Sequence, residues 1–284
     1  MQKITGNRKY YFNNLYFDSI DSEEKAYWLG FLYADGYILS SANGFGCNLK
    51  EDDASHLKKF LKCIDINTLE CLRYDKSTKS YGFDLFDSHT YHELIQLGFT
   101  VNKSYDNNDS IFLKIPDSFK RDFIRGLWDG DGYVSISKAN KNITGIVSNN
   151  EQLLITIANY LCEIFNKKDF CKVTYSDGYP RIRLTCKKAY ELCCYLYNES
   201  KIYLDRKYNA YLNLNKPKIS KYKYKGIKKL PSGRYYTHIN YNNKSETIGT
   251  FDSIKEAIKA YNKRALELGK EPQIYIDEKL ERDI

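Results

Sequence analysis

The chain has little of what marks exported, membrane-spanning or zinc-binding proteins. No apolar run reaches the ~18 residues that a membrane span needs, and the opening MQKITGNRKYYFNNLYFD holds no apolar signal core. The 8 cysteines form no C-x-x-C pair. Among the 4 histidines only His89 and His92 are closely spaced, and they fit a solvated helix face. We therefore expect an intracellular protein in a reducing compartment, with no membrane contact and with reduced, packing cysteines.

Length and charge favour a packed protein with a basic end. The 284 residues, 42% of them hydrophobic, suit two or three domains. The net charge of +8 is uneven, because residues 216–272 hold 14 Lys and Arg against 5 Asp and Glu, whereas residues 1–215 hold 28 against 27. Such a basic block usually binds a polyanion, and nucleic acid is the leading candidate.

One twelve-residue segment occurs twice, as YWLGFLYADGYI at 27–38 and as FIRGLWDGDGYV at 123–134, at a constant offset of 96. Each copy predicts an apolar helix that ends in Asp-Gly, at Asp35 and at Asp131. A helix C-terminus carries partial negative charge, so an aspartate is disfavoured there unless a cation compensates it. Two such helices predict a shared site filled by metal.

Small residues inside both helices predict that the helices pack closely. Gly30 is followed by Ala34, and Gly126 by Gly130, four residues on and therefore on the same helix face. If these stripes pack on each other, the two aspartates end side by side, and a divalent cation would offset their repulsion. For one copy alone, a buried helix with a glycine stop is the simpler interpretation. The matched pair favours the metal site.

The two segments resemble the motifs of a double-motif LAGLIDADG homing endonuclease, at 28–36 and 124–132. The family's metal-binding acid, at the eighth motif position, falls on the two aspartates. The sixth position departs from the family pattern, with Tyr33 in the first copy and Asp129 in the second. The resemblance implies a monomer with two fused halves.

The resemblance also implies a catalytic site for phosphodiester hydrolysis. Asp35 and Asp131 would hold Mg²⁺, which suits oxygen ligands and phosphate. The backbone carbonyls of Ala34 and Gly130 fall where family members add further ligands. Each half would then cut one strand of DNA.

A lysine follows the closing helix of each repeat in the family, and Lys103 and Lys207 match that place. The implied role is to assist at the scissile phosphate. A solvated surface lysine is the alternative for both, and Lys50, Lys138 and Arg206 are possible substitutes.

The pattern after each motif is also repeated. It predicts a hairpin, a helix, a second hairpin and a closing helix, at 37–50, 51–64, 69–86 and 88–97 and again at 133–148, 149–161, 171–185 and 186–198. We therefore predict an α+β fold of two pseudo-symmetric αββαββα repeats, whose antiparallel sheets form a DNA-binding saddle. Candidate DNA contacts on its strands, each alone also consistent with a solvated surface group, are Asn48, Lys50, Arg73, Lys138, Lys172, Arg181 and Arg183.

The basic block predicts a small sheet of three strands backed by one helix, capped at Asp252 or Ser253. Over 224–269 it resembles the ethylene-response-factor (Apetala-type) DNA-binding domain, with matches at Y-K-G-I, G-R-Y, I-G-T-F and E-A-I-K-A-Y-N. Leu230 and Ser232 depart from the family, so sequence preference does not carry over. By position, the implied DNA contacts are Lys225, Lys228, Arg234, His238 and Asn240.

These patterns predict a domain order. The expected parts are an N-terminal arm at 1–22, which touches DNA or packs on the core, repeats at 23–118 and 119–215, a basic linker at 216–223, the small domain at 224–272 and a tail at 273–284. The leading functional hypothesis is a site-specific double-strand DNA endonuclease of intron homing, encoded by a mobile genetic element. The alternatives are an intron-splicing maturase that binds RNA and a DNA-binding regulator with an inactive nuclease core. Retention of both motif aspartates favours the enzyme over the regulator.

Overall fold

The computed structural model describes a chain of two compact units. The described residues are 10–66, 70–101, 107–217, 224–242, 244–270 and 272–273. The units divide between residues 217 and 218. No helix within these ranges combines the length and the hydropathy of a membrane span.

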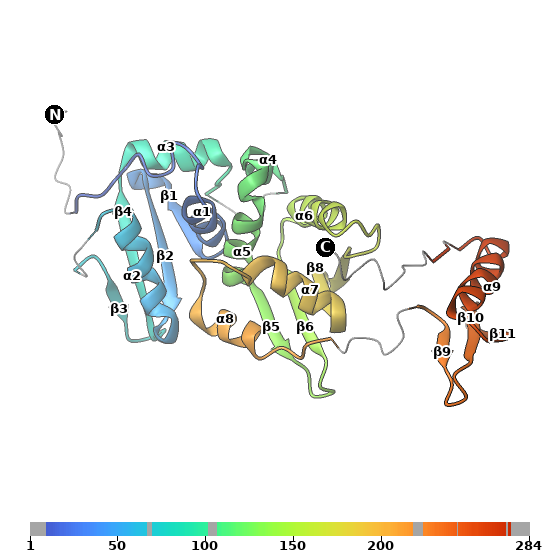
Figure 1. The fold of residues 1–284 in the computed structure, drawn as a ribbon. Helices are drawn as coiled ribbons and strands as arrows, with labels where there is room; N and C mark the ends of the chain where they lie inside the picture. Colours follow the sequence, from blue (N-terminus) through green and yellow to red (C-terminus); the bar gives the residue numbers. More distant parts are fainter. Residues whose placement is uncertain are drawn as a thin grey trace, which may run out of the picture. The chain divides into compact units, whose positions relative to one another are not determined.

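The first unit is built from two repeats with the same order of elements (Figure 1). The first repeat contains α1 (Glu23–Asp35), β1 (Gly36–Leu39), β2 (Gly44–Lys50), α2 (Ala54–Cys63), β3 (Arg73–Asp75), β4 (Ser80–Phe86) and α3 (Ser88–Leu97). The second contains α5 (Lys120–Asp131), β5 (Gly132–Ile136), β6 (Asn142–Val147), α6 (Glu151–Ile164), β7 (Val173–Ser176), β8 (Tyr179–Thr185) and α7 (Cys186–Tyr197). Each repeat forms one antiparallel sheet, in the orders β1-β2-β4-β3 and β5-β6-β8-β7. The predicted α+β class with two αββαββα repeats is confirmed.

Several elements differ from the sequence prediction. Short helices join or follow the repeats at α4 (Ser110–Lys114) and α8 (Asp205–Leu212), with 3-10 turns at Ser40–Ala42, Glu51–Asp53 and Asp117–Phe119. Lys138 was expected on a strand and lies instead in the β5–β6 turn, which the Ser137 amide closes by donating to the carbonyl of Lys141 (2.8 Å). Lys172 likewise precedes β7 rather than lying on it.

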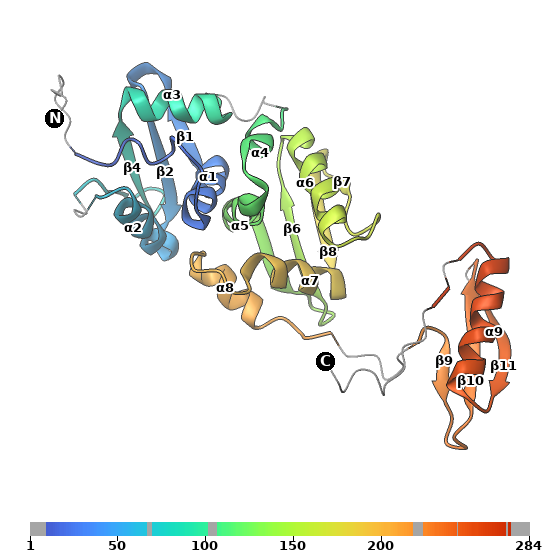
Figure 2. The ribbon, with the colours of Figure 1, turned by 45° about the horizontal axis from the view of Figure 1, so that its top comes forward.

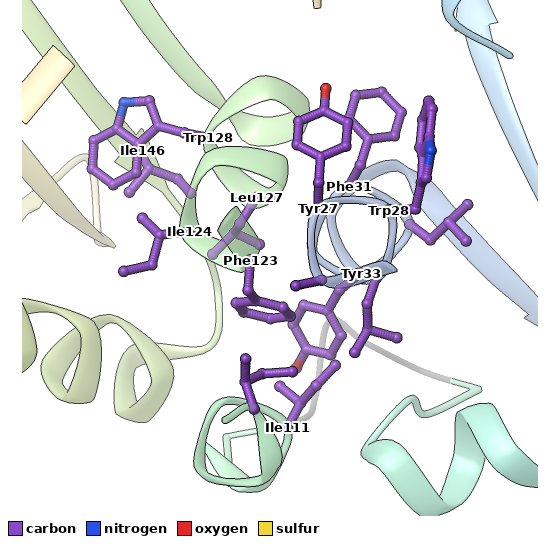
Figure 3. Packing of buried hydrophobic residues seen from close by; sticks show 14 of the residues in the cluster. Tyr27, Trp28, Phe31, Tyr33, Ile111, Phe123, Ile124, Leu127, Trp128 and Ile146 are labelled. Atoms are coloured by element: carbon purple, nitrogen blue, oxygen red, sulfur yellow. The ribbon is translucent and has the colours of Figure 1, made fainter. Parts of the chain in front are cut away.

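Helices α1 and α5 lie side by side between the two sheets, as both ribbon views show (Figures 1 and 2). Residues 26–33 of α1 are all buried, as expected for a helix that is apolar on every side. Figure 3 shows Phe123 of α5 meeting Tyr33 of α1 beside Ile111, and the two aromatic rings lie 6.5 Å apart. The helix pair is therefore the centre of the core.

Glycine makes this close approach possible. A Cβ atom added at Gly30 would lie 2.1 Å from the carbonyl oxygen of Phe123, and one added at Gly126 would lie 2.0 Å from that of Tyr27. Each glycine thus meets the backbone of the opposite helix at the equivalent place. The reciprocal contact defines a pseudo-twofold axis between the repeats.

Each sheet buries one face and opens the other. On β2, Cys47 and Leu49 are buried, whereas Asn48 and Lys50 between and beside them are exposed. On β8 the same alternation buries Ile182 and Leu184 and leaves Arg181 half-buried and Arg183 exposed. The period of two follows from the pleat of a strand. Polar side chains therefore line an open surface on both sheets.

The chain before α1 packs on the first repeat. Tyr16, Phe17 and Ile20 are buried in the main core, and the Asn13 amide donates to the carbonyl of Ile64 (2.9 Å). Within the expected arm at 1–22, this stretch is an extension that packs on the core. Residues 1–9 lie outside the described part of the chain.

The second unit is a three-stranded sheet with one helix. Strands β9 (Ile227–Lys229), β10 (Tyr235–Tyr241) and β11 (Lys244–Phe251) are antiparallel in the order β11-β10-β9, and α9 (Ile254–Glu267) follows. Ser253 is the N-cap, because its side chain accepts from the amide of Glu256. Helix α9 buries Ala257, Ile258, Tyr261 and Ala265 in a core that is separate from that of the first unit. The predicted small sheet with one helix is confirmed.

Candidate functional site

The two motif aspartates end the two central helices. Asp35 is the last residue of α1 and is half-buried, and Asp131 is the last residue of α5 and is exposed. A glycine follows each, and a Cβ atom at Gly36 or Gly132 would lie 2.5 or 2.6 Å from a carbonyl oxygen of its own helix. The helix-to-strand turn therefore requires glycine at this position.

The helix packing brings Asp35 against the end of α5. A Cβ atom added at Gly130 would lie 2.3 Å from the Cβ of Ala34 and 3.3 Å from Oδ2 of Asp35. The carboxylate of Asp35 thus lies against the last turn of α5, which carries Asp131. Any larger residue at position 130 would occupy the space beside that carboxylate.

A buried lysine caps the end of α5. Lys207, in the first turn of α8, donates from Nζ to the carbonyls of Trp128 (2.9 Å), Gly130 (3.0 Å) and Asp129. Burial lowers the pKa of Lys207 to about 8, while the nearby carboxylates of Asp129, Asp35 and Asp131 act in the opposite direction. Lys207 therefore places positive charge beside the partial negative charge at the C-terminus of α5. The sequence had suggested that a metal ion alone would supply this charge. Lys103, the predicted partner of Lys207 in the first repeat, lies outside the described residues.

The donor atoms at this helix junction fit a hard divalent cation. Asp35 and Asp131 offer carboxylate oxygens, and Ala34 and Gly130 offer backbone carbonyls beside them. An oxygen-only donor set next to open surface suits Mg²⁺ or Ca²⁺ rather than zinc. The carbonyl of Gly130 also accepts from Lys207, so one of its two lone pairs is engaged.

Each acid opens into a cavity on the sheet of its own repeat. Asp35 lines a cavity of 780 Å³ together with Gly130 and Arg206, and predicted contacts on this wall are Asn48, Lys50 and Arg73. Asp131 lines a cavity of 450 Å³ with Val147, Tyr179 and other residues of the second repeat, and Tyr33 and Ala34 also line it. Arg206 reaches the first cavity from α8 and pairs with Asp53 (2.7 Å).

On the first sheet the predicted contacts lie in one row across three strands. Asn48 of β2 faces Gly82 of β4, which faces Arg73 of β3. Arg73 pairs with Asp84 (2.7 Å), and the hydroxyl of Tyr37 donates to the same carboxylate (2.6 Å). The arginine on this sheet is therefore already neutralised by an acid.

On the second sheet the arginines have no such acid. Arg183 faces Gly145 of β6, which faces Tyr133 of β5, and Arg181 faces Val147. Neither arginine forms a salt bridge within the described part of the chain, and Nε of Arg181 is buried without a hydrogen-bond partner. These two guanidinium groups are positioned to meet an external anion.

Tyr37 and Tyr133 were not among the predicted contacts, although both lie on the sheets beside them. Each lies over a glycine of the next strand, since a Cβ atom at Gly46 or Gly145 would come within 2.6 Å of the tyrosine ring or hydroxyl. Both tyrosines directly follow the Asp-Gly pair. The sequence signal was present, because the tyrosine is one of the residues shared by the two copies.

The second unit presents its own row of polar residues. Lys228, Tyr236 and Thr250 are in register across β9, β10 and β11, and His238 and Asn240 continue along β10 on the same face. The rings of Tyr236 and His238 stack at 5.7 Å. Tyr236 was not among the predicted contacts, although strand alternation places it beside them.

The other two predicted residues of this unit lie beside the sheet. Lys225 precedes β9, and its amide donates to Oε1 of Gln273 (2.6 Å). Arg234 precedes β10 and pairs with Asp252 (2.7 Å). Both side chains therefore flank the polar row rather than forming part of it.

Comparison with known proteins gives one family match. Residues 118–188, from the turn before α5 to the start of α7, match the family described as a LAGLIDADG-like domain. The matched residues lie within the second repeat, and the first repeat is outside the match. No curated protein matches the chain in sequence.

Several solved structures are similar in fold. The homing endonuclease I-WcaI bound to its DNA recognition sequence is 16% identical, with a TM-score of 0.46, and the match covers 68% of this chain and 90% of that one. The N-terminal LAGLIDADG domain of DUF199/WhiA is 15% identical, with a TM-score of 0.42, and the match covers 68% of this chain and 92% of that one. I-DmoI in complex with DNA and Ca is 14% identical, with a TM-score of 0.39, and the match covers 66% of this chain and 92% of that one. At these identities, nothing about activity passes from those proteins to this chain.

Proposed function

We propose that this protein is a metal-dependent endonuclease that cuts both strands of a specific double-stranded DNA site, as homing endonucleases do. The observation that supports the proposal is that Asp35 and Asp131 end two helices that pack on each other through reciprocal glycine contacts. Each carboxylate opens toward the polar face of its own sheet. One acid for each repeat matches one cut for each DNA strand.

Asp35 and Asp131, with the carbonyls of Ala34 and Gly130, would hold Mg²⁺. The ion would supply a Lewis acid and lower the pKa of bound water. The side chain of Lys207 holds the last turn of α5 in shape and adds positive charge beside the phosphate. The glycine after each acid allows the tight turn from the helix into the next β-strand.

The two open sheet faces and the basic second unit would bind the DNA. Arginine and lysine contact phosphates and guanine, and asparagine contacts adenine, so the surface can both position and read a duplex. We propose that the first unit recognises and cuts, and that the polar row on β9 and β10 adds affinity. One chain carries both halves, so a monomer suffices.

We propose that the protein acts in a reducing compartment within the cell. None of the 8 cysteines forms a disulfide in the structure, and 4 of them are buried. Homing of an intron or another mobile element is the biological role that fits a site-specific double-strand cut.

The test is selection of cut sites from a randomised and a genomic DNA library in the presence of Mg²⁺. The parent chain should cut both strands, and Asp35→Asn and Asp131→Asn should each nick one strand with the other cut reduced at least about 100-fold. Asp169→Asn is the control, because that carboxylate is 98% exposed and lines neither of the two cavities.

Two outcomes would replace the proposal. A parent chain that binds DNA tightly and never cuts it supports a regulator with an inactive core. A parent chain that binds structured RNA and cuts no DNA supports an intron-splicing maturase.

A further inference from the structure

The sixth positions of the two motifs, Tyr33 and Asp129, both reach into the opposite repeat. Tyr33 lies on α1, and its hydroxyl accepts from Nδ2 of Asn150 at the start of α6 (3.1 Å). Asp129 lies on α5, and its Oδ2 accepts from the hydroxyl of Tyr27 on α1 (2.7 Å). All four side chains are buried. The sixth position of each motif thus makes a buried hydrogen bond to the other half.

Asp129 is held more firmly than Tyr33. Besides Tyr27, its carboxylate accepts from the hydroxyl of Tyr197 (2.6 Å) and from the amide of Leu204 (2.7 Å). Because Tyr27 donates to the carboxylate, its oxygen accepts from Nε2 of His56 (2.8 Å), which extends the chain of hydrogen bonds to α2. Buried hydrogen bonds of this kind are costly to break, since each leaves an unsatisfied polar group.

Asn150 gives the Tyr33 contact its rigidity. Its Oδ1 accepts from the amide of Leu153 (3.0 Å) as the N-cap of α6, and its Nδ2 also donates to the carbonyl of Asn108 (2.7 Å). The amide that meets Tyr33 is therefore fixed by the helix it caps. A shift of one repeat against the other would break this contact and leave both groups buried.

Each of these contacts lies two residues before a motif acid. Tyr33 precedes Asp35, and Asp129 precedes Asp131, on the last turn of α1 and of α5. A hydrogen bond from the opposite repeat therefore fixes the helix end that aims each acid. Glycine packing alone would permit sliding along the smooth stripe, whereas directional hydrogen bonds oppose it.

We propose that Tyr33 and Asp129 are positioning residues that lock the two repeats in register, so that both DNA strands are cut in one binding event. The inference rests on the proposed nuclease function. Neither residue needs to touch the DNA or the metal. Loss of a contact between the repeats should uncouple the two cuts, whereas loss of a similar contact inside one repeat should not.

Tyr27 and Tyr197 offer a matched pair for the test, because both donate to the carboxylate of Asp129 but only Tyr27 comes from the other repeat. In single-turnover cleavage of a supercoiled plasmid that carries the selected site, Tyr27→Phe and Tyr33→Phe should slow the second cut about 5- to 10-fold relative to the first. Tyr197→Phe should also lower the melting temperature, because it removes a buried hydrogen bond to Asp129, but it should leave that ratio unchanged. Tyr195→Phe, which loses a hydroxyl contact within the second repeat, is a further control.

A second measurement needs no cleavage. Amide hydrogen exchange of the protein alone should become about 5- to 10-fold faster in the last turn of α1 in Tyr33→Phe. In the last turn of α5, which carries Asp129, exchange should become faster in Tyr27→Phe than in Tyr197→Phe. Equal effects of Tyr27→Phe and Tyr197→Phe on both readouts would overturn the inference. A parent chain that cuts no DNA would overturn the nuclease proposal instead, and the exchange data would still decide whether the contacts lock the repeats.

Discussion

The two repeats share a backbone but not a surface. In the first, the carboxylate of Asp84 pairs with Arg73 and accepts from the hydroxyl of Tyr37. In the second, the place of Asp84 is taken by Arg183, which faces the glycine that lies under Tyr133. The tyrosine-over-glycine contact is kept in both repeats, whereas the charge beside it is reversed. The two repeats thus share the packing of tyrosine on glycine and differ in the charge that their open sheet faces present.

The cores also differ at one matched position. Aligning the buried residues of α2 and α6 places His56 opposite Leu153. His56 packs against Trp28 and Phe31, and burial lowers its pKa to about 3. Among the described residues, the first repeat therefore buries at this position a histidine, which titrates near neutral pH when the chain unfolds, whereas the second repeat buries a leucine.

The largest effect is expected where the repeats are the same. Gly30→Ala and Gly126→Ala should each destabilise the first unit by about 3 kcal/mol or more, because the added Cβ would meet backbone that cannot move aside. Thermal or urea unfolding measures this loss. Gly178→Ala is the control, since its Cβ meets nothing within 4 Å and only the strain of its positive φ remains. Unequal losses at Gly30 and Gly126 would contradict the reciprocal packing.

A smaller effect should separate the sheet faces. Arg183→Ala should weaken DNA binding by about 1–3 kcal/mol, whereas Arg73→Ala should weaken it less, because Asp84 already neutralises that guanidinium. Fluorescence anisotropy with the selected site at several salt concentrations measures both. Loss of a phosphate contact at Arg183 would also reduce the salt slope by about 0.9. If Arg73→Ala costs as much affinity as Arg183→Ala, the difference between the faces has no bearing on binding.

The smallest effect, counted for each pH unit, concerns acid stability. The pKa of His56 is near 3 in the folded state and 6.5 when unfolded, so below pH 6.5 only the unfolded chain takes up this proton. Stability is therefore lost as the pH falls from 6.5 toward 3, by about 1.4 kcal/mol for each pH unit. His56→Leu, which copies the second repeat, should remove that slope in urea unfolding between pH 6.5 and 5. An unchanged slope would mean that another group causes the acid sensitivity.

The sequence allowed the order of elements, the pairing of the two motif helices and the place of both acids to be predicted. These features are local or periodic, and the internal repeat allowed each copy to support the other. The cap that Lys207 places on α5 was not predicted in that form, because it joins residues 77 to 79 positions apart. The turn at Lys138 was also missed, since the strand pattern continues past the point where the backbone leaves the sheet.

By itself, the sequence determined that this protein has two like halves, that glycine lets their helices touch and that an acid ends each helix. Only the tertiary structure decided which side chains meet across those halves. Asn150 and Tyr33 lie 117 positions apart, and Tyr27 and Asp129 lie 102 apart. The physical reason is that backbone preference and hydrophobic period act over a few residues, whereas a buried hydrogen bond depends on the packing of both helices at once.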